Sequence, residues 1–109
     1  MNERDPHDAV DFIYRESAKF AAAKANRIYL EEFRKSKKAL LMAESGAGAV
    51  NAREQYAYAH VDYQALLDGL RSAVEIEESL KWQLTAAQAR VEIWRTESAN
   101  NRAMDRATA

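Results

Sequence analysis

The sequence predicts an all-α protein: a long antiparallel helical hairpin with a short middle helix, assembling into a helical bundle or coiled-coil oligomer. Between residues 63 and 101, apolar residues recur in an alternation of three and four, which is the spacing of a coiled-coil seam. The 109 residues include only three glycines and one proline, so long helices can run without interruption. Two helical stretches of similar length flank one glycine-containing break, which is typical of a helical hairpin.

The first long helix is expected over about residues 6–45 of a single helical domain, 1–109. Asp5 can cap its N-terminus, and Pro6 suits its first position. Its basic residues fall within one arc of the helical wheel, about opposite most of its apolar stripe. This basic arc marks a partner surface or pairs internally with the acidic half of the chain. The stripe consists of Val10, Ile13, Tyr14, Phe20, Ala21, Ala25, Ile28, Tyr29, Phe33 and Leu40, and the basic arc of Lys19, Lys24, Arg27, Arg34, Lys35, Lys37 and Lys38.

The glycine-containing break separates the two long helices. Gly46 can take the left-handed conformation that ends the first helix. Asn51 can cap the short helix, and Asp62 can cap the second long helix. The periodic pattern stops after Asn101, so the tail is expected to fray. The expected elements are a loop and short helix over about 46–61, a long helix over about 62–101 and a frayed tail over 102–109.

The second long helix carries more apolar surface than one hairpin can cover. A second apolar row runs beside its seam, so self-association is the simplest remedy. The alternative is that the short middle helix folds back and covers part of the excess. Glu77 interrupts the seam and needs a partner there, either Lys81 or a basic residue of the first helix, unless a loosened seam leaves it exposed. The expected oligomer seam consists of Leu66, Leu70, Leu80, Leu84, Val91 and Trp94, and the second row of Leu67, Val74, Trp82 and Ile93.

The sequence lacks the residue patterns of catalytic and cofactor sites, so we expect no enzyme, no cofactor and no metal site. It contains no cysteine, and its two histidines, His7 and His60, lie outside the usual metal-ligand spacings. Gly46-Ala47-Gly48 is a lone glycine pair with no strand before it, unlike a nucleotide-binding motif. No apolar stretch approaches a membrane span and the N-terminus lacks a signal peptide, so we expect a cytoplasmic protein without membrane contact.

Binding is the function class that remains. The basic arc could neutralise phosphates of a nucleic acid, and Tyr56, Tyr58 and Tyr63 could stack on unpaired bases. A solvated basic face and tyrosines packed at the hairpin end explain the same residues. The net charge of −1 is unlike the basic domains that bind duplexes. The second apolar row offers a surface for a protein partner or for a second copy.

Several short segments in the C-terminal two-thirds of the chain form a recognisable set. They are Tyr56-Ala57-Tyr58-Ala59-His60, Tyr63-Gln64-Ala65-Leu66-Leu67-Asp68-Gly69-Leu70, Trp82, Ile93-Trp94-Arg95 and Asn100-Asn101-Arg102-Ala103. With these segments, about half of the chain resembles a family of small tailed-bacteriophage proteins, mostly uncharacterised and often encoded beside recombination or replication genes. The resemblance implies a phage accessory protein that acts in the host cytoplasm, and it transfers no site residues.

Three functions are consistent with these features. The first is a non-enzymatic, homo-oligomeric helical adaptor of phage DNA recombination or replication, which docks on proteins and touches DNA through the first helix. The second is a phage inhibitor of a host defence or nuclease complex. The third is a structural coiled-coil component of the virion.

Overall fold

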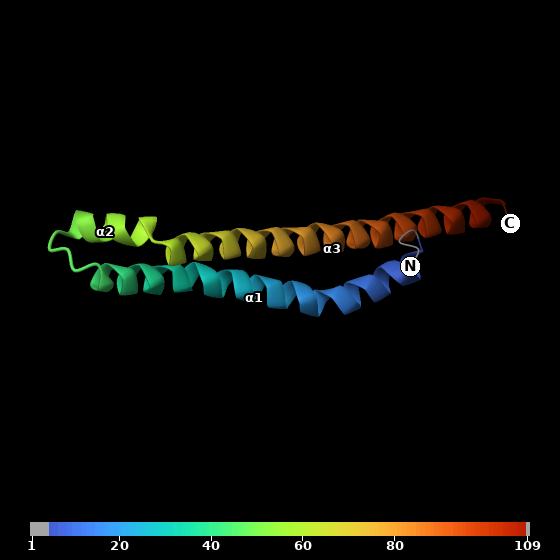
Figure 1. Cartoon of the computed structure of the whole chain (residues 1–109). Helices are drawn as coiled ribbons and strands as arrows, with labels where there is room; N and C mark the ends of the chain where they lie inside the picture. The colour runs from blue at the N-terminus through green and yellow to red at the C-terminus, as the bar shows by residue number, and fades with distance from the viewer. Residues whose placement is uncertain (1–4, 109) are drawn as a thin grey trace. The chain divides into compact units, whose positions relative to one another are not determined.

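The computed structural model describes residues 5–108, which form three helices and, within that range, no strand. They are α1 (Pro6–Glu44), α2 (Val50–Ala59) and α3 (Val61–Thr108) (Figure 1). Two long helices joined through one short helix confirm the predicted all-α fold and its order of elements. Assembly into an oligomer stays a prediction.

The start and the end of α1 follow the predicted signals. The Asp5 carboxylate accepts a hydrogen bond from the backbone N–H of His7 at 2.8 Å, and Pro6 is the first helical residue. At the other end, the Ser45 N–H donates to the carbonyl of Leu41 at 3.1 Å. Gly46 then adopts a φ of +69°, a left-handed conformation that glycine takes at little cost and that directs the chain out of the helix.

Two predicted caps are wrong. α2 begins at Val50 after an extended Ala49, so Asn51 lies inside the helix and does not cap it. α3 begins at Val61, and its cap is His60: the imidazole Nδ1 accepts a hydrogen bond from the N–H of Asp62 at 3.0 Å. Each helix therefore starts one or two residues earlier than the Asn and Asp signals suggested.

The predicted fraying after Asn101 is also wrong for residues 102–108, which continue α3; Ala109 lies outside the described residues. This segment contains no glycine or proline, and alanine, arginine and methionine all favour the helix. The Thr108 hydroxyl also donates to the carbonyl of Met104 at 3.2 Å. Helix propensity therefore extends α3 after its apolar periodicity has ended.

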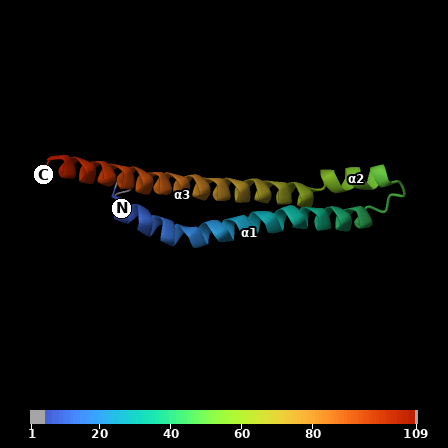
Figure 2. The same cartoon turned by 180° about the vertical axis from the view of Figure 1, so that it is seen from behind.

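The long helices each pass through two structural units. Unit 1 holds residues 5–20 and 79–108, and unit 2 holds residues 21–78. Within unit 2, the C-terminal part of α1 and the N-terminal part of α3 run side by side in opposite directions, with α2 beside the end of α1 (Figures 1 and 2).

The core of unit 2 lies where its three helices meet. Leu41 of α1, Ala57 of α2 and Tyr63 of α3 are 2%, 0% and 8% exposed, with Met42 and Leu67 packed against them. Leu67 belongs to the second apolar row, so this member of the row packs against the core of unit 2 within the chain.

The predicted seam of α3 faces α1 inside the chain. Ala73 and Glu77 are buried in unit 2, and Leu84 and Ala87 are buried in unit 1, whereas Trp94 is 47% exposed. The chain itself therefore fills the seam that was expected between copies, and a contact between copies would use other faces. The half-buried members of the seam are Leu66, Leu70, Leu80 and Val91.

In α1, by contrast, most of the predicted apolar stripe is turned away from α3. Tyr14, Tyr29 and Leu40 are 87%, 62% and 62% exposed. The inward positions of α1 include buried and half-buried residues. The buried ones are Ala9, Glu16 and Leu41, and the half-buried ones include Phe20, Ala23, Arg27, Leu30, Arg34 and Lys37. Of the stripe only Ile13 and Phe20 are half-buried. The side of α1 that faces inward instead carries four members of the basic arc, whose other members remain exposed. The four are Arg27, Arg34, Lys37 and Lys38, and the exposed ones are Lys19, Lys24 and Lys35.

Two adjacent leucines, Leu40 and Leu41, allow a direct test of which side of α1 faces inward. Leu41→Ala should lower the free energy of unfolding by about 2–4 kcal/mol, because it opens a cavity in the core of unit 2. Leu40→Ala, the matched control that is 62% exposed within one chain, should cost clearly less than Leu41→Ala, and less than about 0.5 kcal/mol at protein concentrations too low for copies to pair. Denaturant unfolding monitored by circular dichroism measures both. A larger loss for Leu40→Ala would mean that α1 is rotated with its apolar stripe inward.

Candidate functional site

The centre of the basic arc is occupied by an ion pair within unit 2. The Nε and Nη2 atoms of Arg27 donate to the two carboxylate oxygens of Glu77 at 2.6 and 3.0 Å, and its Nη1 donates to Glu31 at 3.1 Å. The side chains of Arg27 and Glu77 are 24% and 10% exposed. Hydrogen bonding to Glu77 raises the pKa of Arg27 further above its usual range. Of the partners predicted for Glu77, the structure thus selects a basic residue of the first helix.

Two more lysines of the arc pair with acidic residues near the hairpin end. Lys37 lies 3.6 Å from the carboxylate of Asp62, and Lys38 lies 3.7 Å from that of Glu54. The Lys38 ammonium also lies 4.8 Å from the centre of the Tyr58 ring. Hydrogen bonding to Tyr58, with a smaller contribution from the charge of Glu54, raises the pKa of Lys38. These lysines hold α2 and the start of α3 against α1.

The rest of the basic arc is divided between paired and unpaired residues. Lys19 bonds to Glu16 at 3.3 Å and Lys35 to Glu32 at 3.3 Å, both within one turn of helix. With Arg27, Lys37 and Lys38, this makes five of the seven predicted contact residues that are engaged in ion pairs. Only Lys24 and Arg34 have no ion pair with another residue in the range 5–108. The arc therefore does not present a continuous row of free cations.

The three tyrosines proposed for base stacking have different roles in the structure. Tyr63 is 8% exposed in the core of unit 2 and has no face left for a base. Its ring meets that of Tyr58 edge to face at 5.4 Å, and Tyr58 in turn carries Lys38 on its face. Tyr56 is 39% exposed, with its ring centre 5.6 Å from that of His60. Tyr63 thus packs in the core at the hairpin end, whereas Tyr56 and Tyr58 are exposed and their stacking on bases stays a prediction.

Sequence reasoning predicted an apolar stripe on the first helix but missed that α1 exposes it. We name this exposed surface in unit 2 the outward face of α1. Glu32 is the one charged residue near its centre. On this face the rings of Tyr29 and Phe33 stack against each other, with their centres 5.9 Å apart and their planes at 13°. A signal did exist: a carboxylate in the seam of α3, at Glu77, requires a cation from the facing side of α1. The outward face consists of Ala21, Ala22, Ala25, Ile28, Tyr29, Phe33, Ser36 and Leu40, all of them exposed.

The second apolar row of α3 is exposed except at Leu67. Val74, Trp82 and Ile93 are 38%, 62% and 58% exposed. The ammonium of Lys81 lies 5.6 Å from the centre of the Trp82 ring, so Lys81 covers part of that side chain. Trp82 and Ile93 therefore remain available to a partner on the part of α3 that belongs to unit 1.

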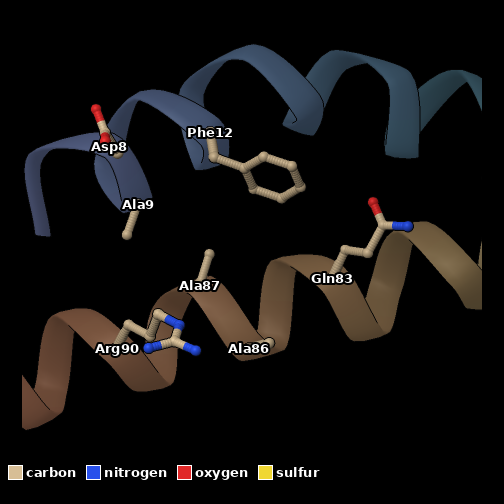
Figure 3. A pocket seen from close by; sticks show the side chains of 7 residues that line it. All are labelled: Asp8, Ala9, Phe12, Gln83, Ala86, Ala87 and Arg90. Atoms are coloured by element: carbon tan, nitrogen blue, oxygen red, sulfur yellow. The ribbon is translucent and has the colours of Figure 1, made fainter. Parts of the chain in front are cut away.

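Unit 1 contains a small pocket between α1 and α3, with a volume of about 100 Å³. Figure 3 shows Ala9 and Ala87 pointing toward one another beside it. Pockets that hold cofactors or drug-sized ligands usually measure about 300–1,000 Å³, so this one suits a few waters or a single inserted side chain. Its lining consists of Asp8, Ala9, Phe12, Gln83, Ala86, Ala87 and Arg90.

Two further features bear on the kind of site that this chain can form. In residues 5–108, no three histidine, cysteine or acidic side chains lie close enough together to hold a metal ion. In the same part of the chain, no helix is both long and apolar enough to span a membrane.

Comparison with models of protein families, with curated proteins and with solved structures found no match to this chain.

The Arg27–Glu77 pair should contribute strongly to stability. Glu77→Ala should lower the melting temperature by about 5 °C or more, because it leaves the half-buried Arg27 without its main partner. Glu78→Ala, at the exposed neighbouring position, is the matched control and should have little effect. The double substitution Arg27→Met with Glu77→Leu should recover most of the loss, since apolar residues can replace a buried pair. Equal losses for Glu77→Ala and Glu78→Ala would contradict this assignment.

Glu16 predicts a pH-dependent contribution to stability in unit 1. Its carboxylate lies 3.1 Å from the Nε of Arg15, and this hydrogen bond, followed by that of Lys19, lowers the pKa of Glu16 from 4.5. A lowered pKa stabilises the fold above pH 4.5, and that stabilisation is lost as the pH falls through the lowered value. Glu16→Gln should therefore reduce the melting temperature at pH 7, with a deficit that fades on acidification below pH 4.5. Thermal melts across this range measure it. A deficit that does not change with pH, or an equal one for the exposed control Glu97→Gln, would argue against the assignment.

Proposed function

We propose that this protein is a non-enzymatic helical adaptor that works through protein–protein contacts. One observation carries the proposal: α1 turns the middle of its basic arc inward and leaves a mainly apolar face, with Glu32 as its one charged residue, in contact with solvent. Contiguous apolar surface on a folded chain marks a contact with another protein, since its exposure to water is unfavourable. Trp82 and Ile93 add a second such surface on α3.

The same arrangement argues against nucleic acid as the main partner. Binding to a phosphate backbone depends on lysine and arginine side chains that are free to replace counterions. Arg27, Lys37 and Lys38 are instead held by Glu77, Asp62 and Glu54. Engaging these cations with phosphates would break contacts that hold α1 to α2 and α3.

The resemblance to small phage proteins gives the adaptor a setting, the recombination or replication of phage DNA in the host cytoplasm. An inhibitor of a host defence or nuclease complex, and a component of the virion, would use the same apolar surfaces. These alternatives differ in the identity of the partner, so the partner must be captured in the cell.

Photo-crosslinking at Trp82 tests the proposal. The full chain carries p-benzoylphenylalanine at position 82, which is 62% exposed, or at the buried control position Leu84. After irradiation in host cells, each adduct is treated with protease or with nuclease and identified by mass spectrometry. We expect an adduct with another protein at position 82 and almost none at position 84. Adducts that nuclease removes would contradict the proposal, and adducts with this chain alone would identify a self-assembling structural protein instead.

A further inference from the structure

We infer that the outward face of α1 in unit 2 is the docking site of a second copy of this chain, packed antiparallel about a two-fold axis near Tyr29. The inference deepens the proposed function, on which it rests, by naming one of the adaptor's partners. It assigns α1 to pairing between copies and leaves Trp82 and Ile93 on α3 for another protein.

The outward face of α1 has a small half and a large half. Before Tyr29 it presents three alanines, with Ile28 beside Tyr29 itself; after Tyr29 it presents Phe33 and Leu40, with Ser36 between them. The alanines are Ala21, Ala22 and Ala25. A two-fold interface brings the same patch of both copies together in reverse order. Ala25 and Phe33 each lie four residues from Tyr29, so the antiparallel arrangement sets the large side chain of one copy against the small one of the other. A parallel arrangement would set Phe33 against Phe33 and leave a gap between the alanines.

The charged residues beside this face also favour antiparallel pairing of the two copies of α1. Glu32 is the one charged residue near its centre, and Lys24 at its edge has no ion pair with another residue in the range 5–108. In the sequence, Lys24 lies five residues before Tyr29 and Glu32 lies three residues after it. Antiparallel pairing therefore brings Glu32 of one copy near Lys24 of the other. Parallel pairing would place the two Glu32 carboxylates together, which is unfavourable.

The chain has enough exposed surface for such a contact. Its accessible surface of 7944 Å² exceeds the roughly 6,100 Å² typical of a folded monomer of its mass. The excess of roughly 1,800 Å² on one chain is more than the roughly 800 Å² that each partner contributes to a standard protein interface. From Ala21 to Leu40 the face extends for about 30 Å along one helix, so a second helix of equal length can pack along all of it.

Cysteine crosslinking can test the position of the axis, because the sequence contains no cysteine of its own. On mild oxidation, Tyr29→Cys should form a disulfide-linked dimer of 24.8 kDa, twice the 12.4 kDa of one chain, because a two-fold axis brings position 29 next to itself. Leu40→Cys alone should stay monomeric on a denaturing gel, since the two copies of residue 40 would lie about 33 Å apart at 1.5 Å per residue. A mixture of Ala22→Cys with Ser36→Cys should give a mixed dimer, whereas each variant alone should not. Crosslinking of Leu40→Cys as efficient as that of Tyr29→Cys would overturn the antiparallel pairing.

Sedimentation equilibrium supplies the second arm of the test, on the unmodified chain. The wild type should sediment as a dimer at micromolar concentration, and Tyr29→Glu with Phe33→Glu should weaken the dimer at least 100-fold. Circular dichroism should show unchanged helix content, because both side chains are exposed within one chain. Trp82→Glu, the matched control on α3, should leave the dimer intact. A wild-type monomer at 100 µM would overturn the self-pairing while leaving the crosslinks of position 82, and with them the adaptor, untouched.

Discussion

The pairing of Arg27 with Glu77 is the interaction on which the rest of this structure depends. Glu77 occupies a seam position of α3 whose neighbouring seam positions, Ala73 and Leu80, are apolar, and a carboxylate there requires a cation from the facing helix. The guanidinium of Arg27 satisfies it with two parallel hydrogen bonds, an arrangement that also restricts direction. Once Arg27 points inward, the rotation of α1 about its axis follows, and the opposite side with Tyr29 must face solvent.

Because α1 is rotated in this way, the single chain has only a small hydrophobic core. Where the three helices of unit 2 meet, Leu41, Ala57 and Tyr63 are buried, but most other buried positions hold alanine or glutamate. Small residues allow helices to approach closely, yet each removes little apolar surface from water. The larger apolar side chains, such as Tyr29 and Trp82, lie outside. Because a partner that binds only the folded chain stabilises it, the same contacts would serve both function and stability.

The elements that sequence reasoning predicted well are those set by local chemistry. The alternation of three and four from Tyr63 to Val91 correctly marked the side of α3 that faces α1. The start of α1 at Pro6 and its end just before Gly46 followed from the fixed φ of proline and the left-handed freedom of glycine. The errors in the other caps are also local: His60 supplies an imidazole acceptor where an Asp or Asn was expected. Helix propensity alone, without an apolar periodicity, explains why α3 continues to Thr108.

The sequence by itself therefore determined that this chain is helical, where its long helices lie and which stripe of α3 is covered. Only the tertiary structure decided which side of α1 faces inward. The apolar stripe and the basic arc compete for that position, and the hydrophobic pattern alone favours the stripe. The choice depends on an ion pair between residues 50 positions apart, together with the pairs that Asp62 and Glu54 make with Lys37 and Lys38. No local pattern contains those distances, because they exist only after the helices have packed.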